Sequence, residues 1–103
     1  MKYKSHITEV EGIRFHSKKE ASRYLVLANL EKEGKIKGLK LQPKFTLIPK
    51  SKHGREIRYI ADFEYYLDDG TYVVEDVKGF RTDVYRLKKR LLAEKTGIEI
   101  VET

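Results

Sequence analysis

The chain has 103 residues, enough for a single domain over 1–103 that buries roughly two-thirds of the surface exposed by its unfolded form. Its 22 Lys and Arg against 16 Asp and Glu leave a net charge of +6, which favours a polyanionic partner, nucleic acid before an acidic membrane surface. The sequence has no Cys, no run of roughly 20 apolar residues and no signal-peptide core, which excludes disulfides, thiolate metal sites and a membrane span and predicts a cytoplasmic protein.

The first third of the chain predicts a hairpin followed by a helix. Residues 1–6 are basic and polar, and we expect a flexible tail that could touch a phosphate backbone. The run ITEVEGIRF (7–15) alternates like two short strands. Ser17 is a good N-cap and Gly34 a natural stop, which predicts a helix over 17–33. Its expected apolar face comprises Ala21, Tyr24, Leu25 and Ala28, with Leu27 as a further candidate.

The rest of the chain predicts strands, a second helix and a last strand. LQPKFTLIP predicts a strand that begins near Pro43. EIRYIADFEYYL and TYVVEDVKG predict a hairpin closed by DDG, and Thr82 and Gly97 delimit a helix over 82–96. IEIV then adds a short strand. The order predicts an α/β or α+β fold, a mixed sheet flanked by two helices. The apolar face expected for the second helix is Val84, Leu87, Leu91 and Leu92.

The DDG turn determines which residues of the hairpin face each other. A three-residue loop, 68–70, would use Gly70 in the left-handed conformation and set Leu67 opposite Thr71. Asp62 then lies opposite Asp76, with Cβ atoms roughly 5 Å apart. Lys78 shares that side, because residues two apart in a strand point the same way. A two-residue loop would instead place the two aspartates on opposite faces.

Two carboxylates side by side in a half-buried strand repel each other unless one is protonated or cations neutralise both. Mg²⁺, which Mn²⁺ can replace, prefers such oxygens, and Asp62, Asp76 and the carbonyl of Val77 would suit it. Lys78 would then stabilise charge on a phosphoryl group during phosphodiester hydrolysis. The alternative is an ordinary surface Asp–Lys pair, which is the better reading of an isolated D-x-K. The paired Asp62 favours a functional site.

These residues resemble the PD-(D/E)XK nuclease superfamily, which has a restriction-endonuclease-like core. The pattern FHSKKEASRY … LQPKF … RYIADFEYY … DGTYVVEDVKG … YRLKKRLL, over residues 12–96, is similar to a family of small bacteriophage proteins placed in that superfamily. Ala61 stands where the superfamily name has proline. The resemblance implies metal binding by Asp62 and Asp76, catalysis by Lys78 and a further acid, Glu20, in the metal site.

Several of these residues have a structural alternative. Ser17 and Glu20 form a capping box, which by itself explains the glutamate. Glu75 alternates to the face opposite Asp76 and is interpreted as a partner for a lysine, although a register slip would make it the working acid. Gln42 resembles a glutamine near the active site of some relatives, yet a polar strand-edge residue is the simpler interpretation.

The resemblance does not settle what the small-phage family cleaves. Our leading hypothesis is an Mg²⁺- or Mn²⁺-dependent endodeoxyribonuclease that is associated with a phage or prophage and acts in the cytoplasm of a bacterial host. Branched DNA, as in recombination, is the substrate that we consider. A homodimer would allow both strands to be cut. An inactive nucleic-acid-binding module on the same fold and an RNA-directed nuclease are the alternatives. Basic residues expected to contact phosphates, some of them explained equally well as a solvated helix face, are Lys18, Lys19, Arg23, Arg81, Lys88, Lys89 and Arg90, with Gln42 as a polar contact.

Overall fold

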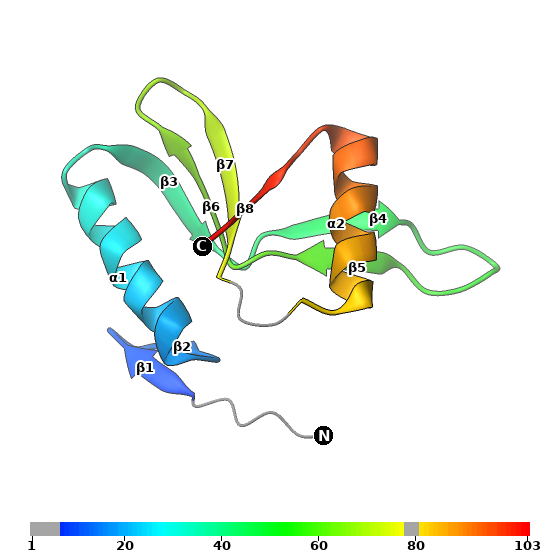
Figure 1. Ribbon diagram of the computed structural model, residues 1–103, viewed down its shortest axis with the longest axis horizontal. Coiled ribbons are helices and arrows are strands. Elements are labelled where there is room, and N and C mark those ends of the chain that lie inside the picture. Colours follow the sequence, from blue (N-terminus) through cyan, green and yellow to red (C-terminus); the bar gives the residue numbers. More distant parts are fainter. Residues whose placement is uncertain (1–6, 78–80) are drawn as a thin grey trace.

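The computed structural model describes residues 7–77 and 81–103 (Figure 1). The predicted basic tail, 1–6, and the predicted catalytic Lys78 lie outside these ranges. The elements are β1 (Thr8–Val10), β2 (Ile13–Phe15), α1 (Lys18–Lys32), β3 (Ile36–Leu41), β4 (Lys44–Ile48), β5 (Ile57–Ile60), β6 (Phe63–Leu67), β7 (Tyr72–Asp76), α2 (Asp83–Thr96) and β8 (Ile100–Glu102).

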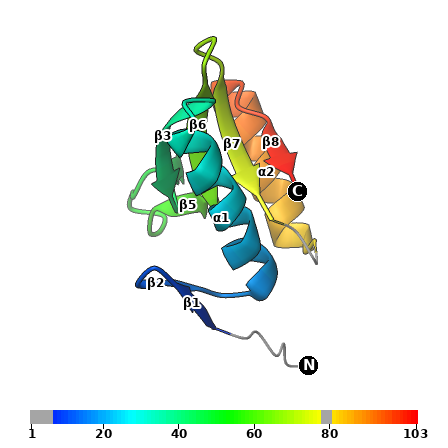
Figure 2. The ribbon, with the colours of Figure 1, turned by 90° about the vertical axis from the view of Figure 1, so that its left-hand side faces the viewer.

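A mixed sheet lies between the two helices. Its strand order is β3-β6-β7-β8, antiparallel except for the parallel pair β7–β8. Figure 2 shows α1 in front of this sheet and α2 behind it. One buried cluster joins α1 to Phe63 and Tyr65, and a second joins α2 to Val74 and Ile100. The predicted α+β fold with two flanking helices is therefore confirmed.

Both helices begin at the predicted caps. The Ser17 hydroxyl accepts a hydrogen bond from the Glu20 amide at 3.1 Å, and the Thr82 hydroxyl accepts one from the Tyr85 amide at 3.0 Å. Gly97 ends α2 in the left-handed conformation, with φ +78°, as a C-terminal cap requires. Local signals that satisfy the free backbone groups thus set the helix limits.

The predicted apolar faces of both helices are partly wrong. In α1, Leu27 is fully buried while Leu25 is 46% exposed. In α2, Leu92 is buried as predicted, but Val84 and Leu87 are 61% and 59% exposed, and Tyr85 is buried in their place. Several residue sets satisfy the helical period, and contact with the sheet selects among them.

The predicted strand over 56–67 is two strands in different sheets. β5 pairs with β4, while β6 pairs with β3 and β7. The chain turns at Ala61 and Asp62, where the Ala61 amide donates to the Pro43 carbonyl and the Asp62 amide to the Glu75 carbonyl. Asp62 therefore lies at the junction of the two sheets, on backbone held from both sides.

Strand β3 was not predicted from the sequence. Its segment, IKGLKL, carries two lysines and Gly38, which obscure a strand pattern. Gly38 has φ +65° and lies where the register with β6 shifts between Lys37 and Lys40, a β-bulge that needs this conformation. No helix within residues 7–77 and 81–103 is long and apolar enough to cross a membrane.

Candidate active site

The hairpin β6–β7 has the predicted register. Phe63 pairs with Glu75 and Tyr66 with Tyr72, and the Leu67 amide donates to the Thr71 carbonyl at 2.8 Å. Gly70 has φ +92°, the left-handed conformation that the three-residue loop requires. The turn therefore sets Asp62 and Asp76 together at the far end of the hairpin.

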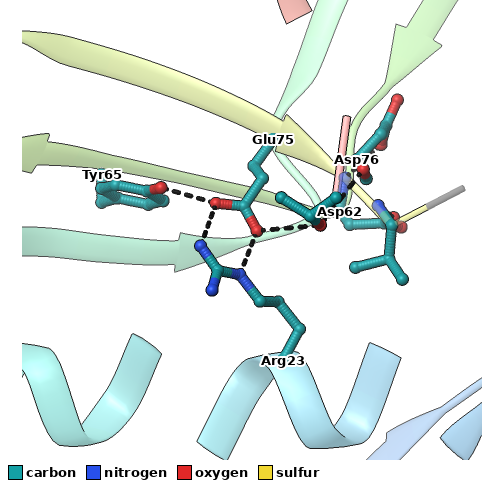
Figure 3. A network of polar contacts seen from close by, with 7 residues as sticks. Arg23, Asp62, Tyr65, Glu75 and Asp76 are labelled. Carbon is teal, nitrogen blue, oxygen red and sulfur yellow. Dashed lines mark hydrogen bonds and ion pairs between the residues drawn. The ribbon is translucent and has the colours of Figure 1, made fainter. Parts of the chain in front are cut away.

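Asp62 and Asp76 lie side by side, and each carboxylate is held by backbone of the opposite segment (Figure 3). Asp76 Oδ1 accepts the Asp62 amide at 2.9 Å, and Asp62 Oδ2 accepts the Val77 amide at 2.7 Å. Asp76 is 1% exposed. Hydrogen bonds of this kind from amides stabilise charged carboxylates, so the pair can stay together at the end of a buried strand.

Glu20 joins this pair from α1. Its side chain is buried, and Oε1 accepts the His16 amide at 3.1 Å, one residue before the N-cap. The pKa of Glu20 is raised to about 7, mainly by burial and then by the hydrogen bond and the charge of Asp62. The charge of Asp76 adds to this rise, and the hydrogen bond from the His16 amide opposes it. The glutamate therefore serves the helix cap and also contacts the acidic pair. We call Glu20, Asp62 and Asp76 the acidic group.

Arg23, one turn after Glu20 on α1, does not extend toward solvent. Its Nε and Nη2 donate to the two carboxylate oxygens of Glu75 at 2.5 and 2.9 Å (Figure 3). The Arg23 side chain is 30% exposed, whereas that of Glu75 is fully buried. Such a bidentate pair fixes orientation as well as charge. The guanidinium of Arg23 is thus engaged in an ion pair inside the protein, which argues against its predicted contact with a phosphate.

The prediction that Glu75 pairs with a lysine is wrong, because its cationic partner is Arg23. The Glu75 carboxylate also accepts the Tyr65 hydroxyl at 2.5 Å and the Thr103 hydroxyl at 3.3 Å. Burial alone would raise the pKa of Glu75, but the hydrogen bonds from Arg23 and Tyr65 outweigh it and the pKa is lowered. Glu75 therefore stays ionised next to Asp76 in the sequence, as a fully paired structural charge.

A second ion pair lies beside Asp76, at the end of β8. Arg81 donates to both oxygens of Glu102, the shortest contact being 2.7 Å, and the Tyr85 hydroxyl donates at 2.6 Å. Lys89 Nζ lies 3.4 Å from the same carboxylate. The hydrogen bond from Arg81, with that from Tyr85, lowers the pKa of Glu102 to about 2. Two of the predicted phosphate contacts are therefore partly neutralised by one carboxylate.

The other predicted contacts are on the surface of the two helices. Lys18 and Lys19 are exposed in the first turn of α1, next to Glu20. Lys88 is half-buried on α2, and Arg90 is exposed there, 3.9 Å from Glu94. Their positions are compatible with phosphate contacts and equally with solvated helix faces.

Gln42 lies at the acidic group in an unusual backbone conformation. Its φ is +54°, and its amide donates to the Asp62 carbonyl at 2.9 Å. A non-Gly residue in this region costs about 1 kcal/mol and persists where surrounding contacts hold it. The backbone of Gln42 is therefore held next to Asp62, in the link between the end of β3 and the start of β4.

The acidic group has the donor chemistry of a site for a hard divalent cation. Among residues 7–77 and 81–103, no three His, Asp or Glu side chains are already set around a common metal position. The Glu20 carboxyl instead lies close enough to Asp62 for that residue to raise its pKa, and at a pKa of about 7 Glu20 can carry a proton there. Carboxylate oxygens are the ligands that Mg²⁺ and Mn²⁺ prefer, and a cation could replace that proton. The acidic group is therefore compatible with the predicted metal in the type of its donors, but it is not a preformed three-ligand site.

Sequence reasoning missed the side chains that support the acidic group. Tyr65, Glu102 and Thr103 were not singled out, and Arg23 was interpreted as a phosphate contact. One signal was available for Arg23, because its spacing of three from Glu20 places both on one side of the helix. The partner of Arg23 on β7, Glu75, is 52 residues away in the chain, beyond the reach of local patterns.

A family model described as "protein of unknown function (DUF1064)" matches residues 1–100. The chain belongs to this family. No curated protein and no solved structure matches it. The description of the DUF1064 family names no activity.

Proposed function

We propose that the protein is a metal-dependent endodeoxyribonuclease that hydrolyses DNA phosphodiester bonds at the acidic group. The observation that carries the proposal is the meeting of Glu20, Asp62 and Asp76, from three separate segments, with the pKa of Glu20 raised to about 7 mainly by burial and by Asp62. Bringing carboxylates together in a poorly solvated site lowers the stability of the fold unless a bound cation offsets their repulsion. Acids with perturbed pKa values of this kind are typical of functional sites.

Asp62, Asp76 and Glu20 would hold the metal, with the Val77 carbonyl as a further ligand. Bound there, Mg²⁺ or Mn²⁺ would polarise a phosphate and lower the pKa of a bound water. The backbone amides of Asp62 and Val77 orient the two aspartates by hydrogen bonding to them. Glu20 can release its proton near neutral pH, and Lys78 is proposed to stabilise charge on the phosphate.

The surface chemistry favours a polyanion as substrate. The net charge is +6. Lys18 and Lys19 directly precede Glu20, and Lys88 and Arg90 lie along α2. Contacts of this kind hold a phosphate backbone without reading bases, so we expect binding that weakens with salt. We further propose that the protein acts in the cytoplasm of a bacterial host on phage DNA and that two copies cut opposite strands.

The test is cleavage of supercoiled, linear and branched DNA by purified protein in Mg²⁺, Mn²⁺ or EDTA, with an RNA panel beside it. We expect cleavage of DNA in either metal and none in EDTA. Metal-dependent cleavage of RNA alone would change the substrate class. DNA binding without cleavage in any metal would overturn the proposal in favour of an inactive nucleic-acid-binding module on the same fold.

A further inference from the structure

A small pocket opens next to the acidic group. Its volume is about 140 Å³, and Glu20 and Asp62 form the acidic part of its wall. The rest of the wall comes from β2 and from the end of β3. Three apolar side chains line it: Ile13, Phe15 and Leu41. The pocket thus joins an apolar interior to two of the three carboxylates that we propose to bind metal.

Two polar side chains complete the pocket. Arg14 and Gln42 line it and are exposed to solvent. Gln42 is held there by its left-handed backbone, φ +54°, and by the hydrogen bond from its amide to the Asp62 carbonyl. An amide side chain can donate and accept hydrogen bonds at once, and a guanidinium can stack on a flat ring or bind a phosphate. The pocket therefore offers a polar edge beside an apolar interior.

The size and charge of the pocket limit what can occupy it. An engineered apolar cavity of about 150 Å³ takes up one benzene molecule, so 140 Å³ has room for about one six-membered ring. An anionic group inside would meet Glu20 and Asp62, which disfavours a phosphate within the pocket. A neutral flat ring whose edge carries donors and acceptors suits the apolar walls and Gln42. A pyrimidine base has this chemistry.

We propose that this pocket binds one unpaired pyrimidine base of a DNA strand whose phosphate lies at the acidic group. The inference rests on the proposed function, because that function supplies DNA as the ligand. A base inside a duplex is stacked and paired, and it cannot enter a pocket of one ring without leaving the helix. The preferred substrate is therefore DNA with unpaired nucleotides, such as a branch, flap or bulge, in place of a continuous duplex.

The test is the affinity of the full chain for three duplexes in Ca²⁺, measured by fluorescence anisotropy. The duplexes share one sequence and differ at their centre, which is fully paired or carries one unpaired thymine or one unpaired adenine. We expect the thymine bulge to bind about tenfold more tightly than the paired duplex, as one bound base implies, and the adenine bulge to fall between them. Equal affinity for all three overturns the proposal.

Two variants test whether the pocket causes the preference for the thymine bulge. Leu41→Trp fills the pocket with a larger side chain. Gln42→Gly removes the side-chain amide, and glycine can adopt the same positive φ. We expect each to reduce the preference for the thymine bulge over the paired duplex to about twofold or less. Leu67→Trp adds the same ring at an exposed position outside the pocket and should retain the full preference. Preference retained in both Leu41→Trp and Gln42→Gly overturns the proposal.

The outcomes separate this inference from the nuclease proposal. Preference for unpaired thymine without metal-dependent cleavage supports the pocket and rejects the nuclease. Cleavage of paired and bulged DNA at equal rates and affinities rejects the pocket alone. Circular dichroism of each variant identifies loss of fold, and Gln42→Gly still tests the pocket if Leu41→Trp is unfolded.

Discussion

Arg23 on α1 and Glu75 on β7 form a bidentate ion pair, with Nε–Oε1 and Nη2–Oε2 distances of 2.5 and 2.9 Å. Arg23 follows Glu20 by one helical turn, and Glu75 precedes Asp76. The pair therefore ties the helix that carries one acid to the strand that carries another. Because Glu75 is fully buried, its charge depends on Arg23, Tyr65 and Thr103 for compensation.

Glu75→Ala should destabilise the protein by about 2 kcal/mol, because Arg23 and the Tyr65 hydroxyl lose their acceptor in a partly buried site. Urea denaturation measures the free energy of unfolding. Glu33→Ala is the matched control, since Glu33 pairs with Lys35 at the exposed end of α1 and should change stability by less than about 0.5 kcal/mol. Similar losses in the two variants would contradict a structural role for the Arg23–Glu75 pair.

The metal-free protein should lose stability as pH rises from about 4.5 to about 7, because the pKa of Glu20 is raised from 4.5 to about 7 in the folded state, mainly by burial. A raised pKa means that the folded state binds a proton more tightly than the unfolded state. The stabilisation is complete below the unfolded pKa and is lost as pH rises through the folded one. At about 1.4 kcal/mol per pKa unit, the loss attributable to Glu20 is at most about 3 kcal/mol.

Thermal unfolding in EDTA across this pH range measures the effect. Glu20→Gln keeps the shape of the side chain and cannot ionise, so its melting temperature should fall less between pH 4.5 and 7 than that of the wild type. Parallel curves for the two proteins would show that Glu20 has an ordinary pKa. Added Mn²⁺ should stabilise the wild type more at pH 7 than at pH 5, since the metal competes with the proton.

Asp76→Asn should reduce cleavage by at least about 100-fold and weaken Mn²⁺ binding, because an amide replaces a charged metal ligand. DNA affinity should be kept or increased, since a negative charge is removed. Lys78→Ala should also reduce turnover but leave Mn²⁺ affinity within about twofold, because an ammonium is no metal ligand. Calorimetric titration with Mn²⁺ distinguishes the loss of a metal ligand in Asp76→Asn from the loss of a catalytic group in Lys78→Ala. Turnover of Lys78→Ala at the wild-type rate would reject a catalytic lysine.

Glu102→Gln should strengthen DNA binding, because Arg81 and Lys89 lose the carboxylate that they share and become available to phosphates. We expect affinity to rise several-fold at low salt and the dependence of log affinity on log salt to steepen by about one unit. Glu64→Gln makes the same change of charge at a site bonded to Tyr72. An equal rise in both variants would show that only net charge matters, and that Arg81 and Lys89 make no specific contact.

The helix limits and the hairpin register follow from local chemistry and can be predicted from the amino-acid sequence. Ser17 and Thr82 cap free amides and so set where the helices begin, and Gly97 ends α2 because it accepts a positive φ. Gly70 likewise accepts a positive φ, which allows the tight turn of the hairpin. That turn sets the register that places Asp62 opposite Asp76. Each of these signals acts within a few residues, which is why it can be read without coordinates.

The contacts that support the acidic group depend on long-range packing, which the local sequence does not specify. Nothing local divides the run around Asp62 into strands of two sheets, or selects Leu27 over Leu25 for burial. The pairing of Arg23 with Glu75 and of Arg81 with Glu102 joins segments distant in the chain, so it depends on how α1, β7 and β8 pack. The hydrophobic pattern allows several faces of a helix to be buried, and packing against the sheet selects one of them. Each buried charge then pairs with an oppositely charged side chain that this packing brings close to it.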